Sequence, residues 1–277
     1  MKKILILAFV SIALNITAQV PFQMNKNGHI IIKAKLNNIE GNFILDTGAG
    51  INVVFKNFSK KLSNTKTPNF FVGHRATGEP IEADLYNANS LEIGTEKFPN
   101  QQYSIIDLDF GDIDGLISLQ PFRNTPVTID YNSQNIYFNK KIKSKKYIDI
   151  QLADEAGKSL DIFTWVKLNN KINIQVELDS GSGKDSYWFS SKLFDYLSVN
   201  KDTFEKKAIK SEFNPKVENY FYIGKSSDLS TINNVSFVKD FNVVFVDGLI
   251  YEGKTSINWL GKVLTIDIFK KKIFIED

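Results

Sequence analysis

Two short stretches of the chain hold residues whose types and spacing could do chemistry. Each is an apolar run that ends in Asp, a hydroxyl residue and Gly: Asp46-Thr47-Gly48 in the first half and Asp179-Ser180-Gly181 in the second. The spacing of the two aspartates along the chain is 179 − 46 = 133. Each half of the chain therefore offers one carboxylate at a strand-ending turn.

A pair of carboxylates supports one particular kind of catalysis. Two carboxylates close together cannot both ionise easily, so they share a proton and titrate as a pair. The ionised member can take a proton from a water molecule held between them, while the protonated member polarises the attacked carbonyl. The glycines permit tight turns, with backbone N–H groups near the carboxylates.

The elements that must position these aspartates are strands. His29–Leu36 and Asn42–Leu45 predict a hairpin that ends at Asp46, and Phe163–Leu168 and Ile172–Leu178 predict the same design ending at Asp179. Both hairpins carry Lys-Leu-Asn-Asn, at 35–38 and 167–170. The repeat indicates one internal duplication.

Later segments also recur. Ile113–Ile117 matches Val246–Ile250 at the same spacing as the two aspartates, and each half closes with a hairpin containing Thr-Ile-Asp, at Asp130 and Asp267. That last spacing is 267 − 130 = 137, which predicts about four extra residues near 253–259. Short helices are expected only at 56–62 and 189–197, apart from the leader described below.

One glycine-punctuated segment differs from the strands around it. Val72–Pro80, which contains Gly73 and Gly78, predicts an exposed hairpin tip that can move. The basic run at 139–146 has no aromatic residues among its lysines and is predicted to be a solvated linker between the halves.

Composition limits the possible functions. Of 277 residues, 43% are hydrophobic and 23% charged, as in ordinary globular proteins, and the formal net charge of +3 argues against an obligatory nucleic-acid partner. The absence of Cys excludes thiol catalysis and thiolate metal sites. We expect no cofactor and no metal.

The start of the chain, at 1–18, predicts an export signal. Lys2 and Lys3 precede an apolar stretch, Ile4–Leu14, and Ala18 offers a small residue for cleavage. The apolar run is too short to span a bilayer comfortably. We therefore expect an exported protein, periplasmic or secreted, with no integral membrane segment once the signal is removed.

On these residues the sequence resembles the aspartic peptidases of the pepsin and retropepsin kind, particularly bacterial retropepsin-like proteins. The resemblance rests on FILDTGAG at 43–50, VELDSGSG at 176–183, the two Asp-Gly-Leu-Ile segments and the two Thr-Ile-Asp hairpins. It covers nearly the whole mature chain in two copies. It implies an all-β fold in which two homologous β-barrel lobes, 19–141 and 142–277, surround a central cleft.

The resemblance also implies roles for individual residues. Asp46 and Asp179 would form the catalytic dyad, with Gly48 and Gly181 shaping the turns. Thr47 and Ser180 would link the lobes through their hydroxyl groups, and Ser182 would hydrogen-bond the neighbouring aspartate. Gly73–Gly78 would be the flap that covers the substrate.

The sequence departs from the family pattern in two places. The family has a glycine after two apolar residues in the strand beneath each active-site turn, where this chain has Ser118 and Tyr251. The first half also lacks a flap tyrosine at an obvious position.

Three other kinds of site fit the sequence less well than the dyad. Ser180–Asp185 lacks the glycine and hydroxyl spacing of a phosphate-binding loop. A serine triad needs a histidine base, and neither His29 nor His74 has such a setting. Two-carboxylate glycosidases do not show a duplicated Asp-hydroxyl-Gly.

The sequence therefore predicts a monomeric aspartic endopeptidase acting on peptide or protein substrates. The alternative is a catalytically inactive peptide- or envelope-binding protein with the same fold.

Overall fold

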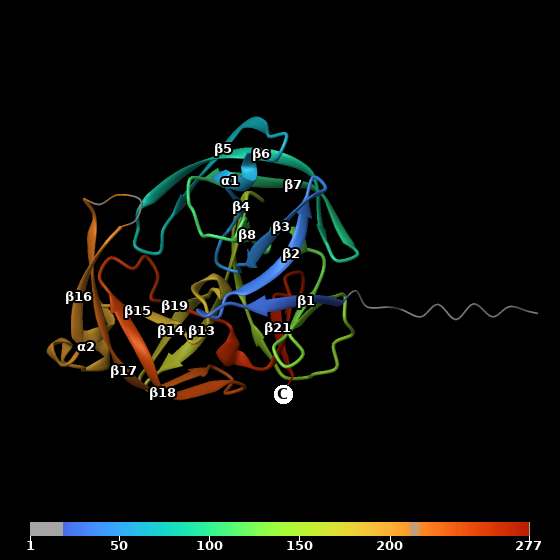
Figure 1. Cartoon of the computed structure of the whole chain (residues 1–277). Coiled ribbons are helices and arrows are strands. Elements are labelled where there is room, and N and C mark those ends of the chain that lie inside the picture. Colours follow the sequence, from blue (N-terminus) through green and yellow to red (C-terminus); the bar gives the residue numbers. More distant parts are fainter. Residues whose placement is uncertain (1–18, 212–213, 215, 277) are drawn as a thin grey trace, which may run out of the picture.

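The fold is built almost entirely of strands. The computed structural model describes residues 19–211, 214 and 216–276, so the predicted signal segment 1–18 lies outside the described residues. Among the described residues the only α-helices are α1 (Lys56–Ser59) and α2 (Leu193–Leu197). The predicted mainly β fold class is confirmed, and Figure 1 shows the strands coloured along the chain.

Six strands of the first half close into a barrel. In hydrogen-bonded order they are β2 (Ile30–Leu36), β3 (Ile39–Leu45), β8 (Gly115–Ile117), β4 (Asn52–Phe55), β7 (Glu96–Ile106) and β6 (Pro80–Ile93). Pairing of β6 with β2 completes the ring, and β5 (Thr65–His74) pairs with β6 outside it.

The second half repeats this arrangement strand for strand. Its ring runs β13 (Ser159–Leu168), β14 (Ile172–Leu178), β19 (Gly253–Thr255), β15 (Tyr187–Ser190), β18 (Phe237–Val246) and β17 (Glu218–Thr231). Pairing of β17 with β13 closes it, and β16 (Glu205–Lys210) takes the place of β5. A further strand, β12 (Gln151–Glu155), pairs with β13. The duplication predicted from the sequence is thus visible in the topology.

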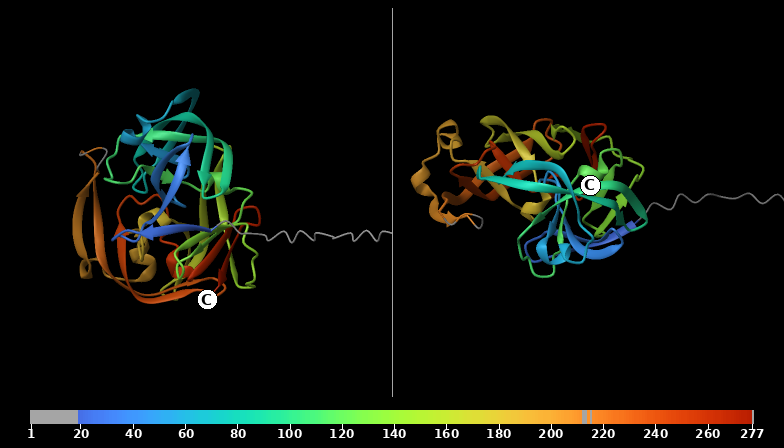
Figure 2. Two further views of the ribbon diagram at one scale, coloured as in Figure 1. Left: turned by 45° about the vertical axis from the view of Figure 1, so that its right-hand side comes forward. Right: turned by 90° about the horizontal axis from the view of Figure 1, so that it is seen from above.

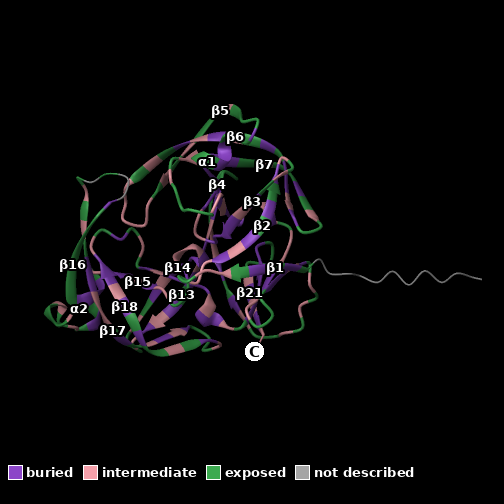
Figure 3. Cartoon of the chain, in the orientation of Figure 1, coloured by how far each residue is buried: buried purple, intermediate pink, exposed green. Residues whose placement is uncertain are grey.

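Alternating side chains explain why these segments form barrels. In β2 every second residue from Ile30 to Leu36 is buried, and in β13 Leu160, Ile162, Val166 and Leu168 are buried. Successive side chains of a strand point to opposite faces, so this alternation places one apolar face inside each barrel. Figure 3 shows the contrast between these strands and the largely exposed β5 and β16.

A third sheet joins the two halves. Its strands are β11 (Tyr147–Asp149), β21 (Lys272–Glu276), β20 (Val263–Asp267), β9 (Val127–Asp130), β10 (Asn135–Phe138) and β1 (Gln19–Met24). At its centre Thr128 lies opposite Thr265, with their hydroxyl oxygens 2.8 Å apart. The two Thr-Ile-Asp hairpins therefore pair with each other. The predicted division of the chain at 141/142 stays a prediction.

Strand register corrects one part of the sequence repeat. Gly115 pairs in parallel with Phe43, and Gly253 pairs in parallel with Val176, which is the counterpart of Phe43 in the repeat. Gly253 is therefore the counterpart of Gly115, whereas 247–250 form a turn after β18. The predicted match of 113–117 with 246–250 is wrong, because the spacing from Gly115 to Gly253 is 138 rather than 133, and the second copy is longer before Gly253.

This register also changes which residue of the second half occupies the position where the family has a glycine. The counterpart of Ser118 is Ser256, which is fully buried like Ser118, and not Tyr251. The small side chain expected beneath the second turn is therefore present.

Candidate active site

Each aspartate is held at the end of a central barrel strand. β3 delivers Asp46 and β14 delivers Asp179, and each strand is paired in parallel with a short strand beneath the turn, β8 or β19. The backbone N–H of Asp46 donates to the Ile117 carbonyl at 2.9 Å, and that of Asp179 donates to the Thr255 carbonyl at 2.8 Å. The barrels thus present the two turns in the same way.

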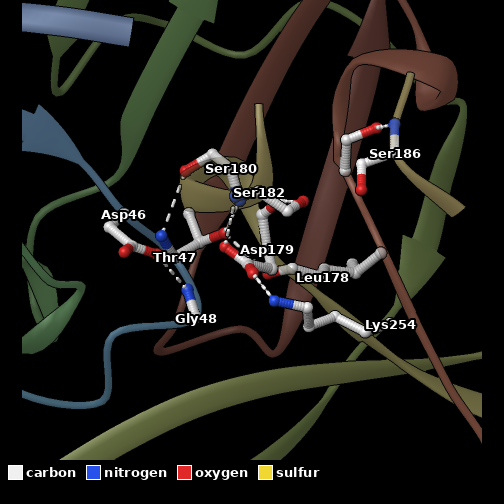
Figure 4. A network of polar contacts seen from close by, with 10 residues as sticks. Asp46, Thr47, Gly48, Leu178, Asp179, Ser180, Ser182, Ser186 and Lys254 are labelled. Carbon is white, nitrogen blue, oxygen red and sulfur yellow. Dashed lines mark hydrogen bonds and ion pairs between the residues drawn. The ribbon is translucent and has the colours of Figure 1, made fainter. Parts of the chain in front are cut away.

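The two turns are bound to each other by reciprocal hydrogen bonds. The backbone N–H of Thr47 donates to Ser180 Oγ, and that of Ser180 donates to Thr47 Oγ1, both at 3.0 Å. The hydroxyl of Thr47 donates to the Leu178 carbonyl at 2.6 Å, and that of Ser180 donates to the Leu45 carbonyl at 2.7 Å. Figure 4 shows the bond from the Thr47 N–H to Ser180 Oγ next to Asp46 and Asp179. All four groups are buried and satisfied, so the lobes are fixed relative to each other at this point.

The glycines let the turns approach the opposite aspartate. A Cβ atom on Gly181 would lie 2.2 Å from Cγ of Asp46, and one on Gly48 would lie 2.7 Å from Cγ of Asp179. The two carboxyl groups lie close enough for each to shift the pKa of the other. The structure therefore brings together the two residues that the sequence singled out.

Backbone N–H groups also reach the carboxylates. Gly48 donates to Asp46 Oδ1 at 3.0 Å, and Ser182 donates to Asp179 Oδ1 at 3.1 Å. The hydroxyl of Ser182 donates to the backbone carbonyl of Asp179 at 2.8 Å. The expected contact of Ser182 with the carboxylate is thus made by its amide rather than by its hydroxyl.

The two carboxyl groups are electrostatically unequal. Burial, reinforced by the neighbouring Asp179, raises the pKa of Asp46 well above its usual range. Burial opposes ionisation of Asp179 too, but the Lys254 ammonium and its hydrogen bond hold the pKa of Asp179 below the ordinary value. Asp179 is therefore the first of the pair to ionise, and Asp46 keeps its proton to higher pH.

Lys254 is a site residue that the sequence reasoning missed. Its Nζ atom donates to Asp179 Oδ2 at 2.6 Å, and 15% of its side chain is exposed. Glu177, two residues before Asp179, is 3% exposed, and burial followed by repulsion from Asp179 raises its pKa well above the usual range. Aligning Gly253 with Gly115 in the repeat would have identified Lys254 as a residue beside the aspartate, because Lys254 directly follows Gly253.

Two further groups extend this charged cluster. Burial and the nearby Asp179 raise the pKa of Asp161, on β13, to about 7. Tyr251 lies near Glu177, and the Tyr251 ring packs against Phe163 with centroids 5.3 Å apart. Tyr251 therefore lies beside the cluster rather than beneath the turn of Asp179.

An apolar pocket opens beside Asp46. It has a volume of about 240 Å³ and includes His29, Asp46 and Gly181 together with apolar side chains of the first barrel such as Val53, Phe55 and Leu108. Burial lowers the pKa of His29, although the Asp179 carboxylate opposes this shift. His29 thus lines the pocket as a half-buried side chain.

The predicted flap is the hairpin of β5 and β6. Gly73 lies in β5 and Gly78 in the connecting turn, where its φ of +87° favours glycine. Figures 1 and 2 show the hairpin reaching from the first barrel toward the second. At its tip the Ala76 carbonyl accepts a hydrogen bond from the Ile250 N–H at 2.9 Å, and Arg75 Nη1 donates to Ser211 Oγ at 3.1 Å. The tip of the first lobe's hairpin is therefore attached to the second lobe.

Two features are absent from the described part of the chain. In residues 19–211, 214 and 216–276 no helix is long and apolar enough to cross a membrane. Within the same residues, no group of three His, Asp or Glu side chains is placed to hold a metal ion.

Comparison with known proteins agrees with this geometry. Residues 32–120, which include Asp46 and most of the first barrel, match the family model described as aspartyl protease. This likeness concerns residues 32–120, which are less than half of the chain. The match ends before Asp179. The assignment of Asp179 as the second carboxylate therefore depends on the topological repeat and on the contact between the two turns.

A solved structure extends the likeness to both lobes. The structure titled "Crystal structure of edgp" matches with a TM-score of 0.53, covering 93% of this chain and 94% of that chain, at 8% sequence identity. At this identity the likeness concerns the fold alone. No curated protein matches the chain in sequence.

Proposed function

We propose that the protein is an aspartic endopeptidase in which Asp46 and Asp179 hold and activate a water molecule. One observation carries the proposal: two carboxyl groups, one from each barrel, lie close together at two reciprocally bonded turns. The match of residues 32–120 to the aspartyl protease family model supports peptidase chemistry at the level of the family.

The unequal carboxyl groups suggest which residue acts as the base. Ionised Asp179 would take a proton from the water as the water oxygen bonds to the carbonyl carbon, and Asp46 would give its proton to the carbonyl oxygen. The resulting tetrahedral diol would collapse when the proton on Asp179 passes to the amide nitrogen and the C–N bond breaks. One hydroxyl group of the diol would return its proton to Asp46 as the product carbonyl forms. Asp46 is then protonated and Asp179 ionised, as before the reaction.

The surroundings of the dyad favour an extended peptide as substrate. The hairpin of β5 and β6 offers backbone groups to a strand lying above the dyad, a mode of binding in which main-chain hydrogen bonds supply affinity. The pocket of about 240 Å³ beside Asp46 suits one apolar side chain of that strand. We therefore expect cleavage next to apolar residues.

The test uses isosteric variants of the dyad. Asp46→Asn and Asp179→Asn should each abolish cleavage of a fluorogenic peptide with two adjacent apolar residues, while the thermal transition persists. The matched control is Asp202→Asn, on an exposed 3-10 turn, which should cleave like the wild type. A statine-containing peptide should inhibit the wild type. Cleavage that survives either dyad variant, or a wild type that cleaves nothing between acidic and neutral pH, would reject the proposal.

One observation favours a second candidate, a non-catalytic peptide-binding protein. The Lys254 ammonium lies 2.6 Å from Asp179 Oδ2 and so competes with a water molecule for that carboxylate oxygen. In this case the wild type would bind the fluorogenic peptide without cleaving it, and Asp179→Asn would bind it as well as the wild type does.

We also propose that the protein is exported and acts as a monomer. The lysines and apolar run of residues 2–14 support export, and the presence of both aspartates on one chain supports a monomer. N-terminal sequencing of the protein from the producing cell should give a start near Gln19. Specific activity should not fall on dilution.

A further inference from the structure

The two barrels differ at one pair of positions next to the aspartates. In the first barrel Ile44 of β3 pairs with Leu116 of β8. In the second, the same places in β14 and β19 are taken by Glu177 and Lys254. An apolar pair in one lobe thus corresponds to a charged pair in the other.

Lys254 is held in an environment that is costly for a charge. Its Nζ atom lies 2.6 Å from Asp179 Oδ2 and 5.2 Å from the centre of the Trp188 ring, and only 15% of its side chain is exposed. An ammonium taken out of water is retained only with close, hydrogen-bonded counter-charges. The ammonium group in Figure 4 points directly at the Asp179 carboxylate. Lys254 therefore acts on one member of the pair more than on the other.

We infer that Lys254 is a positioning residue that keeps Asp179 ionised and so makes Asp179 the base and Asp46 the acid. The inference rests on the proposed function. In an isolated pair of equal carboxyl groups the shared proton has no preferred side, whereas a cation on one side breaks that symmetry. The asymmetry arises from the lobes themselves, because the first lobe has Leu116 where the second has Lys254.

Several titratable groups face this ion pair. Asp179 and Glu177, at the end of β14, face Lys254, as does Asp46 from the first lobe. Asp161 on β13 faces Asp179 and Glu177, and Tyr251 lies near Glu177. Burial raises the pKa values of Glu177 and Asp46, so both remain protonated while Asp179 ionises. His29 faces Asp179, and burial lowers its pKa. The Asp179 and Lys254 charges thus balance each other.

The inference has a distinct signature in the pH profile. The first ionisation of the pair is on Asp179 and sets the acid limb of kcat/KM. Lys254 lowers the pKa of this step more than the pKa of the second step, which is on the more distant Asp46. Removing the cation should move the acid limb toward neutral pH by about one to three pH units, the usual effect of an adjacent opposite charge. The alkaline limb should move less.

Two variants test this with the fluorogenic peptide used for the proposed function. Lys254→Met removes the cation alone. The double variant Glu177→Ile with Lys254→Leu copies the apolar pair of the first lobe, which this fold already accommodates beside an aspartate. Lys97→Met is the matched control. Lys97 makes a similar ion pair with Glu92, 2.9 Å long, but the Lys97 side chain is far more exposed than that of Lys254. We expect a raised acid limb in both test variants and no shift in the control; an unshifted acid limb in the double variant would overturn the inference.

A second readout does not depend on cleavage. Carbon-13 NMR of the aspartate carboxyl carbons, assigned with Asp46→Asn and Asp179→Asn, follows each titration directly. Asp179 should titrate below Asp46 in the wild type, and its midpoint should rise in the double variant. The reverse order in the wild type would refute the role of Lys254 even if peptides are cleaved. The expected order in a protein that cleaves nothing would support that role and reject only the proposed function.

Discussion

Thr47 and Ser180 exchange two hydrogen bonds of 3.0 Å, each backbone N–H donating to the hydroxyl oxygen of the other residue. The two residues come from different barrels and lie far apart in the chain. Each hydroxyl also donates to a carbonyl of the opposite strand, so four buried backbone groups depend on two side chains. This exchange sets the separation of the two carboxyl groups above it.

Replacing Thr47 with valine should destabilise the protein strongly. Valine keeps the shape but leaves the Ser180 N–H and the Leu178 carbonyl without partners, and each buried unsatisfied group costs about 1–3 kcal/mol. The free energy of unfolding in urea measures the loss. Thr203→Val, which removes an exposed hydroxyl bonded to the Asn200 carbonyl, should cost less than about 1 kcal/mol. Equal losses in the two variants would contradict this account.

Gly181→Ala should abolish cleavage because of a steric clash. The new methyl group would lie 2.2 Å from Cγ of Asp46, so the carboxyl group must move. A displacement of about 1 Å can cost about 100-fold in rate, and we expect at least that loss in kcat. Gly157→Ala is the control. A Cβ there has nothing within 4 Å, but the backbone is left-handed, so the variant carries backbone strain without a clash. It should keep normal kcat. Normal kcat in Gly181→Ala would show that the turn tolerates the clash.

Ala76→Glu should release the tip of the flap. Ala76 packs against the apolar cluster of Phe221, Val246 and Leu249 in the second barrel, and its carbonyl accepts from Ile250. A buried carboxylate in that cluster is unfavourable, so the tip should lift. Hydrogen exchange at the Ile250 amide should accelerate and KM for the peptide should rise.

The control for the flap variant is His74→Glu. His74 is exposed at the end of β5, so the same charge there should leave the protection of Ile250 unchanged. If Ile250 is equally protected in Ala76→Glu, its hydrogen bond does not hold the flap closed.

Asp161 should make the protein less stable as the pH rises toward neutral. Its pKa is raised from 3.8 to about 7 in the folded protein, first by burial and then by Asp179, so the folded state binds this proton more tightly than the unfolded state. The resulting stabilisation is complete below the unfolded value and is lost as the pH rises through about 7. Asp161→Asn should therefore show a smaller decrease in unfolding free energy between about pH 4 and pH 7.

The check is a pair of urea titrations across that pH range. Asp109→Asn, at an exposed turn where the carboxylate only accepts from the Gly111 N–H, should follow the wild type. Parallel curves for Asp161→Asn and the wild type would mean that the Asp161 proton does not contribute to stability.

The candidate site shows where sequence reasoning succeeds. Asp46 and Asp179 could be named because a strand that ends in Asp-hydroxyl-Gly is a local pattern, and its recurrence is visible by counting along the chain. Helix boundaries were less accurate. α2 begins at Leu193, because Phe189 and Ser190 belong to β15, where pairing with β18 and β19 overrides a weak local preference for helix.

Lys254 shows where the same reasoning fails. The longer second copy made Asp247–Ile250 look like the counterpart of Asp114–Ile117, although the hydrogen bonds of β14 select Gly253–Thr255. Sequence similarity compares letters at equal spacing, whereas strand pairing depends on which backbone groups meet. The residue next to Asp179 could therefore be found only from the register.

The sequence by itself determined the mainly β fold class, the duplication and the two carboxylates, because side-chain alternation and turn chemistry act over short stretches of chain. Only the tertiary structure decided that the two carboxyl groups lie close together, that Thr47 and Ser180 bind each other, and that Lys254 lies against Asp179. These contacts join segments that are distant in the sequence, and their strength depends on burial. Burial exists only once both barrels have closed, so the inequality of the two aspartates is a property of the folded protein.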